Sequence, residues 1–296
     1  MEKRFVDIVI PVIKPDEEFK TLLDKLAGQK LAPGRIIIMC TDETDSCTNT
    51  NIESIVNSSL AKDIAQIHHL PKAEFNHGMT RNKALEYSDA KYFICMTQDA
   101  VPADNMLTGK LIGAMSETIR MTYARQLARS DANEIEKITR EFNYPDKGCI
   151  KSEKDKDVLG IKTYYASNVC AAYDREIFDS LGGFVETDFN EDMIYAGRLL
   201  KAGYSLAYVP EAKVIHSHNF TGAEQYRRNR EVAKSQELHP EVFGDIKSES
   251  EGIKLVKTTA VMLIKRGRIY LIPKLIWQSA CKYLGYKSGK KEMQNG

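Results

Sequence analysis

The sequence predicts an α/β protein built on a mostly parallel central sheet with helices on both faces. Through the first half of the chain, apolar runs of strand length alternate with amphipathic runs of helix length, the pattern of repeated β-α-β units. Glycine and proline separate many of these runs. In such sheets ligands bind beyond the carboxyl ends of the strands, so the residues that follow each strand are the first candidates for a site.

The elements of the first half are expected to begin as strand, helix and strand. The apolar run Val6–Val12 predicts the first strand, and residues 16–28 predict a helix that ends at Gly28. Residues 35–39 predict a second strand. The series then continues with a strand at 64–68, a helix at 80–88 and a strand at Tyr92–Met96.

The regular alternation weakens after about residue 120. Residues 143–160 carry many charges of both signs and little apolar content, so we expect an exposed, mobile loop there. Further strands are expected at 121–126 and 164–172, and as a pair at 205–209 and 213–216. Further helices are expected at 132–140, 175–181 and 191–202.

Length and composition exclude several classes of protein. The chain has 296 residues, enough for one large domain or two small ones, and its 43% hydrophobic content excludes a disordered or collagenous chain. The 42 Lys and Arg against 41 Asp and Glu leave a net charge of +1, which argues against a protein that coats nucleic acid. None of the six cysteines forms a CxxC pair, so neither a disulfide framework nor a structural zinc site is expected.

The N-terminus predicts a strand rather than a signal peptide, because its apolar run is short and leads into Pro15 and acidic residues. No run reaches the roughly eighteen apolar residues that a membrane-spanning helix needs. We therefore expect a cytoplasmic protein.

The segment from residue 254 onward differs from the rest of the chain in charge. It holds ten Lys or Arg and one acid, Glu292, interleaved with aliphatic residues and aromatics such as Trp277. This composition predicts a pair of amphipathic helices that lie on an anionic membrane surface. The alternative is a basic helical hairpin packed against the rest of the chain or against a second copy in a homo-oligomer. We divide the chain into residues 1–245 and a basic helical segment, 246–296.

Common nucleotide-binding motifs are absent, since no GxGxxG follows the first strand and no GxxxxGK[ST] occurs anywhere. A dehydrogenase or a P-loop enzyme is therefore disfavoured. Instead, one carboxylate, Asp99, lies just beyond the strand Tyr92–Met96 and before a helix that we expect to start at Pro102. An acid at that place can hold Mg²⁺ or Mn²⁺ together with a substrate diphosphate. The role of a helix N-cap explains it equally well.

Two further pairs of side chains could carry chemistry. Glu191 and Asp192 open a predicted helix, where the helix dipole favours acids and where a carboxylate could also take a proton from a substrate hydroxyl. His216 and His218 follow a predicted strand two residues apart, so their rings point to one side and could complete a metal site or hydrogen-bond a loop. Three other histidines are expected to be structural or exposed, namely His68, His69 and His239.

A loop before the fourth strand is rich in hydrogen-bonding residues. Residues 74–82 lead into a helix start, where backbone N–H groups and a guanidinium can meet a phosphate or a nucleobase. Arg81 is the best candidate, with Asn76 and His77 beside it. The alternative for Arg81 is a solvated position on a helix face.

Together these motifs resemble those of family-2 inverting glycosyltransferases of the GT-A fold, and in particular bacterial rhamnosyltransferases of cell-surface polysaccharide synthesis. The stretches that carry the resemblance are FNHGMTRNKALEYS, TQDAVP, YARQLARSDANEIEKITREFNYP, SNVCAAYDREIFDSLGGF, NEDM and PEAKVIHSHNFT. The resemblance spans residues 5–243. It implies a GT-A catalytic domain over residues 1–245, followed by the basic segment 246–296.

The resemblance implies a role for each matching residue. Asp99 stands at the final, metal-coordinating position of the family's DxD motif, whose first two positions are Thr97 and Gln98 here. Asp192 stands where the family places its general base, with Glu191 beside it.

Other matching positions imply contacts to metal or donor. His216 or His218 matches a late histidine that contacts the metal or the diphosphate. The nucleobase-binding aspartate of the family falls near Cys40 or Thr41, and Asp42 is the neighbouring acid. Further donor contacts are implied for Pro11, Asn76, His77, Arg81 and Gln98.

The implied reaction is inverting transfer of a sugar, rhamnose from dTDP-rhamnose, to a glycan or lipid-linked acceptor, with Mg²⁺ or Mn²⁺ at the diphosphate. The implied place is the cytoplasm, peripheral to the inner face of the cell membrane. Alternatives are a transferase of the same fold that uses another sugar nucleotide and a non-catalytic, membrane-associated scaffold that binds one. A nucleotidyltransferase is disfavoured because no glycine-rich loop follows the first strand.

Overall fold

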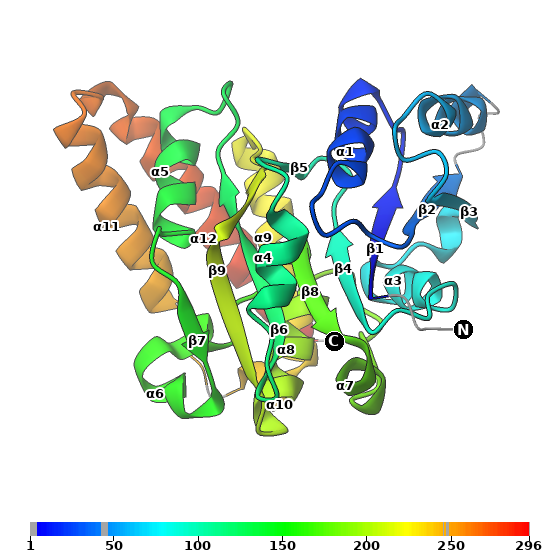
Figure 1. The fold of residues 1–296 in the computed structure, drawn as a ribbon. Helices are drawn as coiled ribbons and strands as arrows, with labels where there is room; N and C mark the ends of the chain where they lie inside the picture. The colour runs from blue at the N-terminus through cyan, green and yellow to red at the C-terminus, as the bar shows by residue number, and fades with distance from the viewer. Residues whose placement is uncertain (1–4, 43–46, 245, 247–248, 296) are drawn as a thin grey trace.

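The computed structural model describes residues 5–42, 47–244, 246 and 249–295, which fold around one sheet of nine strands (Figure 1). The strands are β1 (Val6–Val12), β2 (Ile36–Asp42), β3 (Ala65–Pro71), β4 (Tyr92–Met96), β5 (Val101–Pro102), β6 (Ile119–Leu127), β7 (Cys149–Lys151), β8 (Cys170–Asp174) and β9 (Ser205–Ile215). Their order across the sheet is β3-β2-β1-β4-β8-β6-β9-β5, and β7 pairs with β9 beside this path.

Helices cover both faces of the sheet. The first six are α1 (Glu17–Ala27), α2 (Cys47–Asn57), α3 (His77–Leu85), α4 (Leu107–Gly113), α5 (Glu134–Asn143) and α6 (Lys156–Leu159). The others are α7 (Arg175–Ser180), α8 (Glu191–Lys201), α9 (Gly222–Leu238), α10 (Pro240–Phe243), α11 (Glu249–Lys265) and α12 (Ile272–Asn295). The predicted α/β class is confirmed.

The direction of the strands decides where a site can form. β1 pairs in parallel with β2 and β4, β2 with β3, and β6 with β9, whereas β8 runs antiparallel to both β4 and β6. β1 to β4, β6 and β9 therefore share one direction, and their carboxyl ends meet along the upper edge of the sheet in Figure 1. This edge is where the candidate residues that follow the strands come together.

Both faces of the sheet are buried, which explains the continuous apolar runs of the strands. In β1, Ile8 and Ile10 lie in the core shared with α1, α2 and α4, while Val9 points to the opposite core, shared with α3, α7 and α8. These three side chains are fully buried. A strand between two cores cannot alternate apolar with polar residues.

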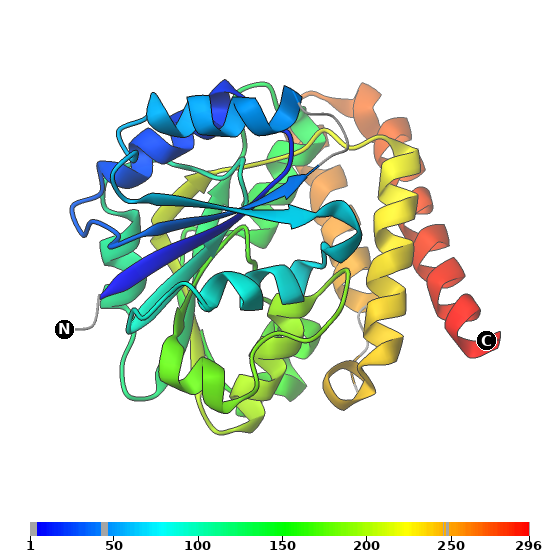
Figure 2. The ribbon, with the colours of Figure 1, turned by 90° about the vertical axis from the view of Figure 1, so that its right-hand side faces the viewer.

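The C-terminal helices pack on the rest of the chain. α11 contacts α5, and α12 lies along α9, as Figure 2 shows. Leu263 and Leu275 are buried in a small core with Ile135 and Ile138 of α5. No helix in the described ranges is both long enough and apolar enough to cross a bilayer.

Residues 143–160 are not the mobile loop that the composition predicted. They contain β7, which pairs with β9, and the short helix α6. Lys151 of β7 is buried, and its ammonium donates to the carbonyls of Lys162 and Tyr165. Alternating charge concealed this element, because the aliphatic part of a lysine can be buried while its nitrogen finds local acceptors.

Three other local predictions need correction, and two of the longer helices were missed. Residues 205–216 do not form a strand pair: β9 is one strand that pairs with β6 across an irregularity. Only the end of the predicted strand 164–172 is extended, because β8 begins at Cys170. Pro102 belongs to β5 and starts no helix. Two longer helices were not predicted: the first residues of α2, CTNTN, are polar, and α9 is polar along most of its length.

Candidate active site

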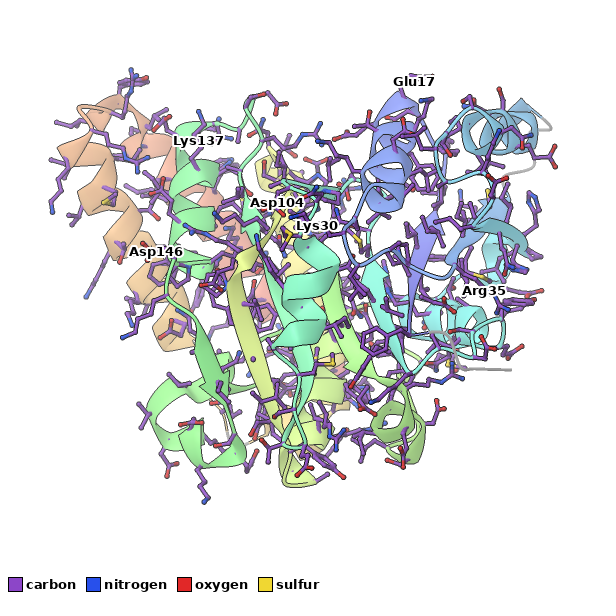
Figure 3. The ribbon with its side chains drawn as sticks, viewed as in Figure 1. Glu17, Lys30, Arg35, Asp104, Lys137 and Asp146 are labelled. Atoms are coloured by element: carbon purple, nitrogen blue, oxygen red, sulfur yellow. The ribbon has the colours of Figure 1, made fainter. Side chains whose placement is uncertain are left out.

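Three side chains that the sequence connects with a metal meet at the carboxyl edge of the sheet. Asp99 follows β4, and His216 and His218 follow β9. The two Nε2 atoms lie 3.1 Å apart, and Asp99 Oδ2 lies 3.4 Å from His216 Nε2 and 3.2 Å from His218 Nε2. We call these residues the Asp-His-His triad. Figure 3 labels Glu17 on α1 and Lys137 on α5, which stand on the two sides of this edge.

The ring of His216 is oriented by Gln126. The amide nitrogen of Gln126 donates to the hydroxyls of Tyr144 and Ser167 at 2.5 and 3.0 Å, so its Oε1 is the atom that faces His216 Nδ1 at 3.1 Å. Nδ1 is therefore the donor, and in the neutral ring Nε2 directs a lone pair towards Asp99. Burial lowers the pKa of His216, which favours this neutral form.

The triad fits a divalent cation. A ring lone pair and a carboxylate oxygen that face each other are two acceptors without a proton between them, and a cation at that point would satisfy both. One carboxylate with two imidazoles can hold a divalent first-row metal ion such as Mn²⁺, and a carboxylate shared with a substrate diphosphate suits Mg²⁺. The N-cap alternative for Asp99 is wrong, because the next helix, α4, begins at Leu107 and its N-cap residue is Met106.

The predicted donor contacts on the first strands lie at the same edge. Gln98 Oε1 accepts the backbone N–H of Ile13 at 2.7 Å, and its amide nitrogen donates to the Ile13 carbonyl at 3.0 Å. This pair of bonds ties the chain after β1 to the chain after β4. Pro11 is half-buried within β1, and Asp42 is the last residue of β2.

Residues 74–82 lead into α3 and connect this helix with α8 through Arg81. Asn76 is the N-cap of α3, and its Oδ1 accepts the backbone N–H groups of Gly78 and Met79 at 3.1 Å. His77 is half-buried, and burial lowers its pKa. Arg81 is only 3% exposed, and its guanidinium lies 3.1 Å from Glu191. It is therefore not the solvated arginine that the alternative foresaw.

Glu191 and Asp192 have different surroundings. Glu191 is buried and accepts a hydrogen bond from the Asn168 amide nitrogen at 3.0 Å, in addition to its ion pair with Arg81. Asp192 is half-buried and accepts the backbone N–H of Asn168 at 2.8 Å. Burial, and then the charge of Glu191, raise the pKa of Asp192 to about 7. At neutral pH this carboxyl group can exchange a proton.

Hydrogen bonds and one peptide link connect Asp192 with the triad. Asn168, which holds Asp192, follows Ser167 in the chain, and Ser167 accepts from the amide of Gln126. Gln126 in turn contacts His216. No motif in the sequence assigns a role to Gln126 or Asn168, although both lie in stretches that carry the family resemblance.

Arg228 on α9 is a further residue near the triad, and no sequence motif points to it. Its guanidinium carbon lies 4.7 Å from the ring centre of Phe220 and 5.5 Å from that of Phe189. The Phe220 ring is also 4.9 Å from the ring of His218. Stacking on two rings holds this exposed cation next to the triad. In the sequence Arg228 is one of several arginines in the run YRRNR, and nothing in this pattern distinguishes it from the others.

Sequence comparisons identify relatives of this chain. The Glycosyl transferase family 2 profile matches residues 7–182. The O-antigen chain rhamnosyltransferase RfbN of Salmonella typhimurium is 35% identical over 289 residues, which cover 96% of this chain and 89% of RfbN. The O-antigen chain rhamnosyltransferase WbaN of Salmonella anatum is 36% identical over 262 residues, which cover 87% of this chain and 80% of WbaN.

Solved structures share the fold. The mannosyltransferase PcManGT from Pyrobaculum calidifontis, in complex with GDP-Man and Mn²⁺, matches 98% of this chain and 88% of its own with a TM-score of 0.64 at 14% identity. S. aureus TarS 1-349 matches 99% of this chain and 92% of its own with a TM-score of 0.52 at 14% identity. This likeness confirms the GT-A fold.

The family profile covers more than half of the chain, and both curated relatives exceed 30% identity over most of it. The chain is therefore a glycosyltransferase that belongs to glycosyl transferase family 2.

Proposed function

We propose that this glycosyltransferase moves rhamnose from dTDP-rhamnose to a glycan or lipid-linked acceptor, with inversion, in the synthesis of a cell-surface polysaccharide. The rhamnose and the pathway are supported by RfbN and WbaN, whose names describe O-antigen chain rhamnosyltransferases. The observation that carries the proposal is the approach of Asp99, His216 and His218 to one point on a sheet edge that also holds Asp192.

Asp99, His216 and His218 are the proposed ligands of Mg²⁺ or Mn²⁺. PcManGT, which shares the fold, was solved with GDP-Man and Mn²⁺. When bound, the cation would neutralise the charge that develops on the leaving diphosphate, an effect worth several kcal/mol. Gln126 contributes by holding the His216 ring with Nε2 towards Asp99.

Asp192 is the proposed general base. A pKa of about 7 leaves it basic enough to accept the proton of an acceptor hydroxyl and still ionised in much of the enzyme at neutral pH. The hydroxyl oxygen then attacks the anomeric carbon from the face opposite the diphosphate, and the bond to the diphosphate breaks. Such general-base assistance typically contributes about 10²–10⁴-fold.

Glu191 has a positioning role in this proposal. Its carboxylate is held by Arg81 and Asn168, so it keeps α8 and the chain around Asn168 in register and raises the pKa of Asp192. Asn76 and His77 hold the start of α3 beside this pair. Pro11, Asp42 and Gln98 are the proposed contacts to the donor nucleotide, because β1, β2 and β4 are neighbouring parallel strands that end at the same edge of the sheet as the triad.

The segment 246–296 is proposed to hold the enzyme at the anionic inner face of the cell membrane. Its helices carry exposed apolar side chains among the basic residues, including Ile253, Val261, Ile264, Ile269, Tyr270, Ile276, Trp277, Tyr283 and Leu284. Apolar and basic side chains together favour an anionic lipid surface. Self-association through this surface is the competing explanation.

The test of the proposed function is nucleotide release without acceptor. The full-length protein should release dTDP slowly from dTDP-rhamnose when Mn²⁺ is present and not in EDTA, with GDP-mannose and UDP-GlcNAc as comparison donors. Mn²⁺ with dTDP-rhamnose should also raise the melting temperature, because the ligand binds only the folded state. Release from another donor would establish a transferase of different donor specificity, and binding without release would establish the non-catalytic scaffold.

A further inference from the structure

Arg228 is a cation to which the proposed reaction has so far given no role. It lies on α9, the helix that begins four residues after His218 of the triad. Its neighbour Arg230 is paired with Glu231 and Glu292. For Arg228, the described residues provide neither an ion pair nor a hydrogen bond. The N–H groups of its guanidinium are therefore available to an anion.

Two aromatic rings position this guanidinium. Its central carbon lies 4.7 Å from the ring centre of Phe220 and 5.5 Å from that of Phe189. Stacking fixes the plane of a guanidinium and leaves free the N–H groups, which lie in that plane. Phe220 also contacts the ring of His218 at 4.9 Å, and Phe189 lies three residues before Asp192. Arg228 is thus held by one residue that adjoins the triad and by one that adjoins the proposed base.

The loop before α8 is fastened to the same helix that carries Arg228. The hydroxyl of Ser235 on α9 donates to the Phe189 carbonyl at 2.6 Å, and the side-chain amide of Asn190 donates to a carbonyl of α9 at 3.2 Å. Asn190 has a φ of +65°, a conformation that asparagine adopts more readily than most residues. It directly precedes the acid pair that opens α8. These bonds keep the distance between Arg228 and the acid pair nearly constant.

The charges of the proposed metal site favour a further cation. A divalent ion would have one carboxylate ligand, Asp99, and two imidazoles, which bind a metal in their neutral form. A departing nucleoside diphosphate carries about three negative charges near neutral pH, so an excess of about two negative charges remains. This charge increases on the leaving oxygen as the sugar departs. A fixed cation beside it therefore acts most strongly in the transition state.

We infer that Arg228 is a catalytic residue that binds the terminal phosphate of the leaving nucleoside diphosphate. The inference rests on the proposed function and adds a residue to it. The bond between the anomeric carbon and the phosphate oxygen breaks, and its electron pair stays on that oxygen. Arg228 donates hydrogen bonds to the phosphate and keeps its protons. A planar guanidinium can form two parallel bonds to one phosphate, which a lysine cannot.

The first test compares the binding of dTDP and dTMP to the full-length protein by calorimetry, with Mn²⁺ present. Arg228→Gln should weaken dTDP binding about tenfold, the loss of one charge-assisted contact, and leave dTMP binding unchanged, because dTMP lacks the terminal phosphate. Arg227→Gln, at the exposed preceding position, is the matched control and should bind both nucleotides like wild type. The pairs UDP with UMP and GDP with GMP are measured in the same way, so the comparison does not depend on the donor base.

The second test measures donor hydrolysis without acceptor. Arg228→Ala should lose roughly 10²-fold in kcat, and Arg228→Lys should recover part of the loss. Phe189→Leu removes one stacking ring and keeps the charge, so its loss should be smaller. Guanidinium ions at millimolar concentration should restore part of the rate of Arg228→Ala, and urea, which has the same shape without the charge, should not. The melting temperature of Arg228→Ala without ligand should stay near that of wild type, since no ion pair is lost.

Three results would overturn the inference. They are unchanged binding of nucleoside diphosphates by Arg228→Gln, an equal loss of affinity for diphosphates and monophosphates, and rescue of Arg228→Ala by urea as well as by guanidinium. The proposed function is tested separately. If the wild type hydrolyses no donor while its affinity for nucleoside diphosphates still depends on Arg228, the proposed function fails and the assignment of the phosphate contact stands.

Discussion

The guanidinium of Arg81 lies 3.1 Å from the carboxylate of Glu191, and the two side chains are only 3% and 8% exposed. The pair joins α3 to α8, two helices more than a hundred positions apart in the chain. A buried ion pair need not stabilise more than an apolar pair would, but removal of one partner leaves the other charge buried and alone. The structure thus depends on both residues being present.

Arg81→Met should lower the free energy of unfolding by about 3–5 kcal/mol, because Glu191 would remain buried without its cation. Urea unfolding followed by circular dichroism at pH 7 measures the loss. Lys83→Met on the same helix breaks the exposed pair of Lys83 with Glu74 and should cost less than about 1 kcal/mol. Equal losses in the two variants would contradict the assigned burial of the Arg81 pair.

The reaction should depend on pH through Asp192. Because the base acts in its ionised form and its pKa is raised to about 7, kcat/KM should rise as the pH increases through 7 and level off above it. Asp192→Asn should lose about 10²–10⁴-fold in kcat with little change in donor affinity. Asp188→Asn, at an exposed position in the preceding loop, is the control and should keep its turnover. A flat pH profile between 6 and 8 would remove Asp192 from the proposed role.

Ionisation of the same carboxyl group should lower the free energy of unfolding as the pH rises. Its folded-state pKa lies above the unfolded value, so between about pH 4 and 7 the native state holds a proton that the unfolded chain has lost. Stability therefore decreases as the pH rises through this window. Asp192→Asn cannot ionise and should melt at a higher temperature than wild type at pH 8, with a difference that shrinks towards pH 4 in scanning calorimetry. A variant less stable than wild type at pH 8 would refute this expectation.

Metal binding should depend on the triad and on the residue that orients it. His218→Ala should abolish most Mn²⁺ binding measured by electron paramagnetic resonance, because it removes one of three ligands. Gln126→Ala should weaken Mn²⁺ binding by about 10–100-fold, since it no longer holds His216 Nδ1. His239→Ala, whose ring pairs with Glu241 on another part of the chain, should bind Mn²⁺ normally. Unchanged affinity in His218→Ala would eliminate the proposed metal site.

The contact between α12 and α9 should tolerate no side chain at Gly285. A methyl group there would overlap the backbone carbonyl oxygen of Tyr226, and Gly289 one turn later faces Arg230 in the same way. Gly285→Ala should therefore lower stability by roughly 1–3 kcal/mol through overpacking. Gly252→Ala on α11 meets no atom within 4 Å and should be neutral or stabilising by up to about 1 kcal/mol. Thermal unfolding measures the stability of both variants. A Gly285→Ala variant as stable as wild type would show that α12 and α9 can move apart without a loss of stability.

Much of the fold was predictable from local pattern. The continuous apolar runs predicted β1, β2 and β4, because strands between two cores need no polar face. The positions of Asp99 and of the histidines after predicted strands indicated one edge, because parallel strands end together. The strand β7 and the single strand β9 could not be predicted in this way. Lys151 appears polar in sequence and is buried through contacts with residues that lie up to 28 positions away.

The sequence by itself determined the α/β class, the family and the residues that end the strands, because these depend on neighbours along the chain. Only the tertiary structure decided that Glu191 pairs with Arg81, that Gln126 orients His216, and that the backbone of Asn168 holds Asp192. Each of these contacts joins residues that are distant in sequence. Their energies come from burial and charge in a packed interior, which no local pattern records.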